Sequence, residues 1–148
     1  KGNLTQNDRT FIDNAIAYMN LDDIRHQYID SLSGGQRQRA YIAMTLAQDT
    51  DYILLDEPLN NLDMKHSVQI MQVLRKLATE LNKTVVIVIH DINFASCYSD
   101  YIVAMKNGKL VHQGEVNHIM QSPVLQDIYD MTIPIQDIDD HKIAVYFR

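Results

Sequence analysis

The spacing of apolar residues in the first third of the chain predicts helices. Apolar side chains recur every three or four positions over residues 12–19, and Asn7 can cap the helix that they predict. We expect a short helical piece over residues 21–28 and a longer helix from the glycines near position 34 to Gln48. Small alanine side chains line one side of this longer helix, so we expect that side to be buried against a sheet.

Two continuous apolar runs in the middle of the chain predict parallel strands. Residues 52–55 and 84–89 lack the alternation of a half-exposed strand, so we expect each to be covered on both faces. A helical stripe lies between them and consists of Ile70, Met71, Leu74, Leu77, Ala78 and Leu81. A strand, a helix and a strand in this order predict a right-handed parallel crossover and hence an α/β fold.

Polar residues follow both of these strands directly. Asp56 and Glu57 end the first run, and His90 and Asp91 end the second. The carboxyl ends of parallel strands meet at one edge of a sheet, where open α/β sheets bind their ligands. The side chains of two adjacent acids point apart, so Asp56 and Glu57 can serve different roles. Such a pair is otherwise often only a solvated turn or a helix cap.

Turn residues divide the last third of the chain. We expect a short helix over residues 92–99, and the Asn-Gly dipeptide at 107–108 between apolar runs predicts a β-hairpin. Residues 114–130 have a helical pattern with a break at 122–123, and residues 142–147 alternate as a late strand does.

The composition is typical of one globular domain, with 148 residues of which 46% are hydrophobic and 22% are charged. Thirteen basic and nineteen acidic residues give a net charge of −6, which disfavours non-specific binding to nucleic acid or to an anionic membrane. The apolar runs are far shorter than the ~20 residues of a membrane helix. The single Cys97 and the lack of a secretory signal pattern favour a reducing, cytoplasmic location.

The stretch LSGGQ at residues 32–36 has the composition of an anion site. Glycines let the backbone approach a phosphate, and N–H groups at the start of a helix lack partners within it. The Ser33 hydroxyl adds a donor. Arg37 and Arg39 also suggest a nearby anion, because the helix dipole disfavours positive charge there. An ordinary helix capped by Ser33 is the alternative that these residues alone leave open.

Residues 32–58 resemble the ATP-binding subunits of ABC transporters. In that family LSGGQ is the signature motif, and its usual continuation, QRQRxxIAxxLAxxxxxLLLDEP, is matched closely by residues 36–58. The resemblance extends over nearly the whole chain. It implies a partial P-loop NTPase fold with parallel strands, a crossover helix, a remnant of the helical subdomain and a carboxyl-terminal β-hairpin. Residues 59–64 and 92–95 look like the iron-siderophore importer branch.

The resemblance also implies a role for each matched polar residue. In ABC ATPases the aspartate that matches Asp56 holds Mg²⁺, usually through water, and the glutamate that matches Glu57 polarises the attacking water. The histidine that matches His90 contacts the γ-phosphate, whereas a histidine at a strand end is otherwise most often structural. Asp63 falls in the D-loop, which crosses the dimer interface, and it can also cap the helix beginning near Met64.

In this family two ATPase subunits pack head to tail, and each ATP lies between the phosphate loop of one and the signature motif of the other. Ser33, Gly34, Gly35 and Gln36 would then bind the partner's nucleotide, so ATP and Mg²⁺ are the implied cofactors. The implied partners are a second ATPase subunit and membrane permease subunits, with no nucleic acid and no direct membrane insertion. Such a subunit is cytoplasmic and peripheral at the inner face of the membrane.

The five glycines of the chain do not form a phosphate loop of the type GxxxxGK[ST]. We therefore expect one domain that is the carboxyl-terminal part of an ABC ATPase. Residues 1–48 would belong to the helical subdomain and residues 49–148 to the core. We expect no ATP hydrolysis by this chain alone. Strands without their neighbours leave open edges, which favour self-association.

Two other functions stay open. A soluble ABC ATPase of DNA repair or translation would use the same residues, although the acidic balance disfavours a nucleic-acid surface. A noncatalytic interaction module would keep the half-fold as a scaffold, and the intact Glu57 and His90 weigh against it. A gene that continues upstream into a phosphate loop, beside permease and binding-protein genes, would favour the transporter.

Overall fold

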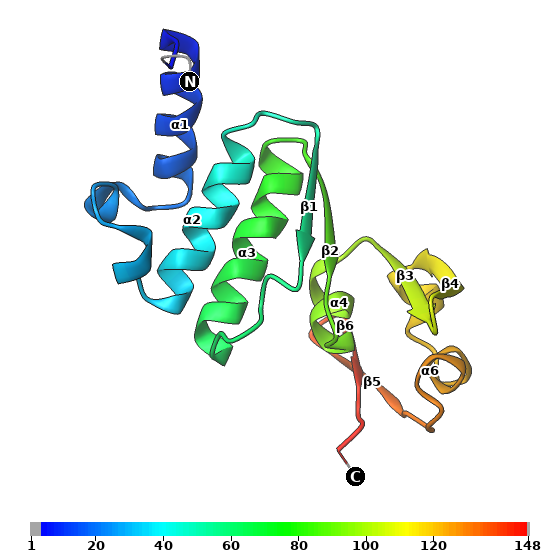
Figure 1. Cartoon of the computed structure of the whole chain (residues 1–148). Helices are drawn as coiled ribbons and strands as arrows, with labels where there is room; N and C mark the ends of the chain where they lie inside the picture. Colours follow the sequence, from blue (N-terminus) through cyan, green and yellow to red (C-terminus); the bar gives the residue numbers. More distant parts are fainter. Residues whose placement is uncertain (1–3, 148) are drawn as a thin grey trace. The chain divides into compact units, whose positions relative to one another are not determined.

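The computed structural model describes residues 4–147, which form two compact units (Figure 1). The first unit ends at Val88 and the second begins at Ile89. The elements of the first unit are α1 (Gln6–Tyr18), the 3-10 turns η1 (Asp22–Ile24) and η2 (Ile29–Ser31), α2 (Gly34–Leu46), β1 (Tyr52–Asp56), α3 (Met64–Glu80) and β2 (Thr84–Val88). The sequence predicts a helical subdomain over residues 1–48 and a core over residues 49–148. That division follows the subdomains of the resembled family, and it stays a prediction.

Helix α1 is capped by Thr5, so the prediction that Asn7 caps it is wrong. The Thr5 hydroxyl accepts the N–H of Asp8 at 3.1 Å, and the Asp8 carboxylate accepts the N–H of Thr5 at 2.8 Å. This reciprocal capping box satisfies two amide groups, whereas a lone asparagine cap satisfies one. The helical piece predicted over residues 21–28 is present only as the 3-10 turn η1.

Helix α2 packs mainly on two other helices, so its predicted contact with a sheet is wrong. Its packing partners are α1 and α3, and Figure 1 shows α3 between α2 and the two strands. Ile42 and Ala43 are buried, whereas Met44 is exposed. The small side chains therefore allow close packing of helices, which the sequence pattern alone does not distinguish from packing on a sheet.

Strands β1 and β2 pair in parallel and are connected through α3, which confirms the predicted crossover. Ile53 lies opposite Val85, and Asp56 lies opposite Val88. Four residues of the predicted apolar stripe on α3, Ile70, Met71, Leu74 and Leu77, are buried. The core of this unit also includes residues from α1, α2, β1 and the turn after β1. Its buried side chains are Ala15, Met19, Leu21, Ile42, Ala43, Ile53, Pro58, Ile70, Met71, Leu74 and Leu77.

One face of this two-stranded sheet is exposed, which contradicts the prediction that both faces are covered. Leu54 is 70% exposed and Val86 is 49% exposed, whereas Ile53 is 1% exposed. The exposed side chains alternate with the covered ones along each strand, as the two-residue period of a strand requires. Among the described residues, side chains therefore pack against only one face of the β1–β2 sheet. The apolar character of the open face indicates that this surface suits a further packing partner.

The second unit contains α4 (Ile92–Tyr98), β3 (Tyr101–Lys106), β4 (Lys109–Glu115), α5 (Val116–Ile119), α6 (Ser122–Tyr129), β5 (Ile135–Ile138) and β6 (His141–Ala144). The β3–β4 hairpin turns at Asn107 and Gly108, both with positive φ, which confirms the Asn-Gly prediction. The core of this unit consists of Ile92, Ile119, Met120, Leu125, Ile133 and Ala144. Within residues 4–147 there is no helix of the length and apolarity that crossing a bilayer requires.

A second antiparallel hairpin, β5–β6, was not predicted as a pair. Its turn residues Asp139 and Asp140 have φ values of 48° and 64°, and Ile138 pairs with His141 across them. Aspartate tolerates the left-handed region better than most residues, so an Asp-Asp pair can replace Asn-Gly in such a turn. That pair was the available signal for the hairpin.

Helix α4 is tied to the edge of β6 by side-chain hydrogen bonds. The Asn93 amide oxygen accepts the N–H of Ala144 at 2.7 Å, and its Nδ2 donates to the carbonyl of Ala144 at 3.1 Å. The Ser96 hydroxyl donates to the carbonyl of Lys142 at 2.6 Å. Asn93 therefore continues the sheet ladder with its side chain and satisfies both polar backbone groups of a buried residue.

Replacing Asn93 with alanine is expected to destabilise the second unit by about 1–3 kcal/mol. The substitution leaves the N–H and carbonyl groups of Ala144 unpaired in a position that is closed to water. Thermal unfolding of the variant measures this loss, and Asn117→Ala on the exposed surface is the matched control. Equal stability of both variants would contradict a role for Asn93 in holding β6.

Candidate functional site

The turn before α2 is a capping box, so Ser33 caps the helix, as in the alternative that the sequence left open. The Ser33 hydroxyl oxygen accepts the N–H of Gln36 at 3.3 Å, and the Gln36 side-chain oxygen accepts the N–H of Ser33 at 3.0 Å. A helix start has four N–H groups without partners inside the helix. The capping box satisfies two of them, so the N–H groups of Gly34 and Gly35 are left over.

The residues of this turn differ in how accessible they are. Ser33 and Gly34 are exposed, whereas Gly35 is buried. The exposed part carries backbone donors at the positive end of a helix dipole, which suits an anion.

Of the two arginines after the turn, Arg37 has a different use from the predicted one. The Arg37 guanidinium donates to the carbonyl oxygens of Ile29 at 3.3 Å and of Asp30 at 3.0 Å. Arg37 thus holds η2 against α2, and its position is explained without an anion. The Nε atom of Arg39 is buried and has no hydrogen-bond partner within the described chain.

Asp63 caps α3, which confirms one of the two roles considered for it. Its carboxylate accepts the backbone N–H of His66 at 2.8 Å and lies 2.7 Å from the Nδ1 atom of the same residue. These hydrogen bonds, the backbone one first, hold the pKa of Asp63 below its ordinary value. Asp63 is therefore an exposed carboxylate that is ionised at neutral pH.

The start of α2 and the start of α3 lie in contact. A β-carbon on Gly34 would lie 3.7 Å from the side chain of Leu62, and one on Gly35 would overlap the ring of His66. The structure therefore brings the predicted ligand residues of the glycine turn close to the segment that holds Asp63. These residues come from positions far apart in the sequence.

The two acids at the end of β1, Asp56 and Glu57, differ in backbone conformation. Asp56 is the last residue of the strand and is exposed, whereas Glu57 has φ 47° in the left-handed region. The Glu57 N–H donates to the carbonyl of Val88 at 3.0 Å. A left-handed backbone costs roughly 1–3 kcal/mol for a residue other than glycine, and such strain is concentrated at functional sites.

Asn60 is a site residue that sequence reasoning did not assign. Its Nδ2 donates to Oε2 of Glu57, and its backbone N–H donates to the Glu57 carbonyl at 3.1 Å. Asn60 therefore fixes both the turn and the carboxylate of Glu57. The signal in the sequence was an asparagine three positions after the acid, which is the spacing of a tight turn.

The chemistry of Asp56 fits Mg²⁺ better than a metal held by protein ligands alone. Within the described part of the chain no three or more His, Cys, Asp or Glu side chains form a group that could hold a metal ion. Mg²⁺ usually keeps several waters and binds through one or two carboxylates together with phosphate oxygens. A single exposed carboxylate at a strand end meets that requirement.

His90 lies in the second unit, beside a cavity of about 340 Å³. Asp91 lines the same cavity and caps α4 by accepting the N–H groups of Asn93 at 2.8 Å and Phe94 at 3.0 Å. Burial, and after it the nearby Asp91 carboxylate, raises the pKa of the Tyr129 hydroxyl, and Tyr129 also lines the cavity. Glu57 belongs to the other unit, so the proximity of Glu57 and His90 stays a prediction.

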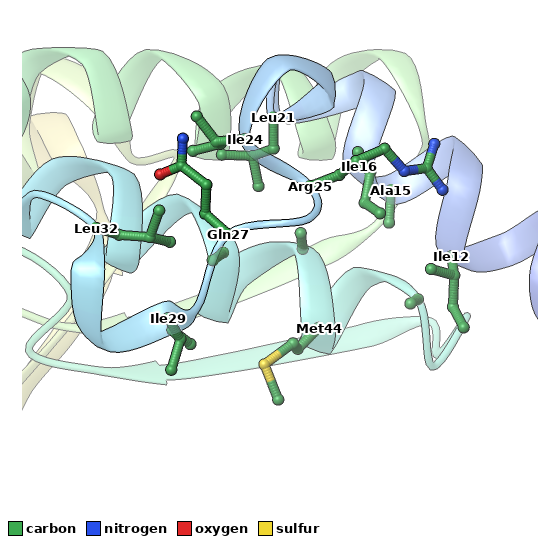
Figure 2. Close-up of a pocket in the computed structure, with 13 residues that line it drawn as sticks. Ile12, Ala15, Ile16, Leu21, Ile24, Arg25, Gln27, Ile29, Leu32 and Met44 are labelled. Atoms are coloured by element: carbon green, nitrogen blue, oxygen red, sulfur yellow. The ribbon is translucent and has the colours of Figure 1, made fainter.

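A second cavity, of about 350 Å³, lies in the first unit (Figure 2). Apolar side chains from α1, α2 and the segment between them line it, including Ile12, Ile29 and Met44. Arg25, at its edge, is paired with the carboxylate of Asp13. The cavity therefore offers an apolar surface and no group that is suited to acid–base chemistry.

Sequence comparison shows which family of proteins this chain resembles. The profile described as ABC transporter matches residues 2–60. The chain is 63% identical, over 99% of its length, to the petrobactin import ATP-binding protein YclP of Bacillus subtilis (strain 168). The chain is therefore similar to the ATP-binding proteins of ABC transporters. Within them it fits the iron-siderophore importer branch, since other relatives are named for petrobactin or iron(3+)-hydroxamate import.

Solved structures have the same fold. A transporter assigned to the metal-chelate type of ABC transporters, in an inward-facing conformation, matches 99% of this chain and 60% of its own with a TM-score of 0.87 and 26% identity. The dimeric ATP-binding cassette MJ0796, bound to ADP and Pi in a post-hydrolysis state, matches 78% of this chain and 50% of its own with a TM-score of 0.64 and 35% identity.

The matched proteins are longer than this chain. It spans 58% of the length of the petrobactin import relative. The fold class predicted from the sequence is confirmed as the α/β fold of ABC ATPases with a parallel strand pair and carboxyl-terminal hairpins.

Proposed function

We propose that this chain works as the carboxyl-terminal part of the ATP-binding and hydrolysing subunit of an ABC importer for ferric siderophores. The observation that carries the proposal is the exposed turn at Ser33 and Gly34, with two glycine N–H groups left over at the start of α2. Such a turn can donate hydrogen bonds to a terminal phosphate. The complete subunit would form a head-to-tail dimer, in which Ser33, Gly34, Gly35, Gln36 and Asp63 serve the partner's nucleotide.

The acids at the end of β1 would work on the nucleotide of their own subunit. Asp56 would hold Mg²⁺ through water, and the Glu57 carboxylate would accept a hydrogen bond from the attacking water and so orient it. Mg²⁺, when bound, neutralises charge on the phosphates. The hydrogen bond from Asn60 and the strained backbone of Glu57 support this assignment, because both hold the carboxylate in a defined position.

His90 would contact the γ-phosphate from the second unit. Its position two residues after β2 supports this role, because ligands of open parallel sheets bind at the carboxyl ends of the strands. Asp91 and α4 would hold the histidine loop in place.

Transport of a ferric siderophore is proposed from the relatives, whose names refer to petrobactin and iron(3+)-hydroxamate import. Closure of the ATP-bound dimer would drive the membrane permease subunits, and hydrolysis would reopen the dimer. The subunit would be cytoplasmic and would attach to the inner face of the membrane through the permease. We propose no nucleic-acid partner, since the net charge is −6.

The phosphate loop would be supplied by sequence outside these residues, because the chain has no GxxxxGK[ST] string. The open apolar face of β1 and β2 supports this division, since the sheet of a complete subunit would bury Leu54, Val86 and Val88. Exposed on its own, the same face favours self-association of the chain.

The chain alone is expected to show no ATPase activity above background, whereas the complete subunit hydrolyses ATP. The physical reason is that residues 1–148 lack the lysine and the amide cradle that hold the β- and γ-phosphates. Phosphate release with Mg²⁺ and ATP measures both proteins side by side. ATP turnover by the chain alone would contradict the proposed division of the site, and an inactive complete subunit would contradict the proposed function.

A further inference from the structure

The two glycines of the turn before α2, Gly34 and Gly35, differ in the space that the fold leaves for a side chain. A β-carbon built on Gly34 would lie 3.7 Å from the nearest side-chain atom of its own chain, which is an ordinary contact. A β-carbon on Gly35 would lie 2.5 Å from Cδ2, 3.0 Å from Cγ and 3.2 Å from Nε2 of His66. The fold therefore accepts a side chain at Gly34, whereas the His66 ring excludes one at Gly35.

The His66 ring that excludes this side chain is itself held in place. Its Nδ1 atom lies 2.7 Å from Oδ1 of Asp63, and the same oxygen accepts the His66 backbone N–H at 2.8 Å. The side chain of His66 is 39% exposed and that of Asp63 is 65% exposed, so both lie at the surface where the two helices begin. One imidazole thus contacts the glycine turn on one side and the carboxylate that caps α3 on the other.

We propose that His66 is a positioning residue that locks the glycine turn to the start of α3, so that Ser33, Gly34 and Asp63 face one ligand as a rigid unit. This proposal rests on the proposed function for its consequence, which is that a partner's nucleotide meets both segments together. A rigid arrangement favours binding because less conformational freedom is lost when the ligand is engaged. The contact itself does not depend on the proposed function.

The first experiment tests the contact between Gly35 and His66 in the complete subunit. Gly35→Ala is expected to lower the melting temperature by about 5 °C, because the added methyl group overpacks against the ring. His66→Ala removes the ring, so Gly35→Ala made in that background should lower the melting temperature by less than about 2 °C. Should Gly35→Ala fail to yield folded protein, recovery of folded protein by the double variant is the expected result.

Additive effects in this cycle would overturn the proposed lock. Gly34→Ala is the matched control, because the fold has room for its methyl group, and its effect should be the same with and without His66.

The second experiment separates positioning from stability. It measures the dissociation constant of the dimer formed with ATP when hydrolysis is blocked, at a temperature well below unfolding. His66→Ala is expected to weaken this association by about tenfold. His66→Asn keeps a donor to Asp63 near the position of Nδ1 but lacks the ring atoms that contact Gly35, so it is expected to weaken the association about as much as His66→Ala. His26→Ala is the control, since His26 lies on the exposed surface.

The outcomes distinguish this proposal from the proposed function. A wild-type subunit that does not associate with ATP would contradict the proposed function, whereas the stability cycle would still decide whether the lock exists. Wild-type association by the His66→Ala variant, together with a coupled stability cycle, would show a packing contact only and would overturn the positioning role.

Discussion

Glu57→Gln in the complete subunit is expected to lower ATP turnover by about 10²- to 10⁴-fold, with ATP binding retained. The glutamine side chain has the size of the glutamate but lacks the charge that polarises water. Its amide oxygen can still accept the hydrogen bond that Asn60 donates to Glu57, so the turn should keep its geometry. The loss would then report on chemistry rather than on folding.

Two measurements check this expectation. Steady-state phosphate release gives the turnover, and sedimentation with ATP gives the fraction of dimer, which should be equal to or greater than that of wild type. Asp51→Asn, which changes an exposed acid just before β1, is the matched control and should keep normal activity. Normal turnover by the Glu57→Gln subunit would remove Glu57 from the mechanism.

Gly34→Asp is expected to abolish ATP-driven association while leaving the fold intact. The fold has room for a β-carbon at Gly34, and an acid in the first turn of a helix is stabilising. The same carboxylate would stand among the donors proposed for a phosphate, and like charges at an interface cost several kcal/mol. We therefore expect the dimer to weaken by about 100-fold or more.

Gly34→Ala separates charge from bulk in this experiment. It adds the β-carbon without the carboxylate, so it should keep most of the association, and both variants should unfold at or above the wild-type temperature. Association of the Gly34→Asp subunit at wild-type strength would mean that no anion binds at this turn.

The sequence predicted those features that depend on local chemistry. The Asn107-Gly108 turn and the crossover from β1 through α3 to β2 follow from residues near one another in the chain. So does the Ser33 cap of α2, which the sequence left open as the alternative to an anion site. The same local reasoning failed where two neighbouring residues compete. Thr5 prevails over Asn7 as the cap of α1 because Asp8 completes a reciprocal pair with it.

Features that depend on tertiary packing could not be predicted in this way. The contact of Gly35 with His66 joins segments far apart in the sequence, and no spacing rule indicates it. The apolar run of β1 predicted two covered faces, but Leu54 is exposed because α3 covers one face only. The sequence shows that a strand is apolar, but it does not show which of its two faces another element covers in the fold.

The central claim is that the glycine turn of one subunit and the acid pair of another complete the same site, and mixing two inactive subunits tests it most directly. One subunit carries Glu57→Gln and the other carries Gly34→Asp. Each mixed dimer then has one site with both residues intact. At a protein concentration at which sedimentation detects mixed dimers, we expect turnover to recover to at most roughly a quarter of wild type, the value reached when half of the dimers are mixed. A mixture as inactive as its separate components would show that both residues serve a nucleotide within one chain, which contradicts the claim.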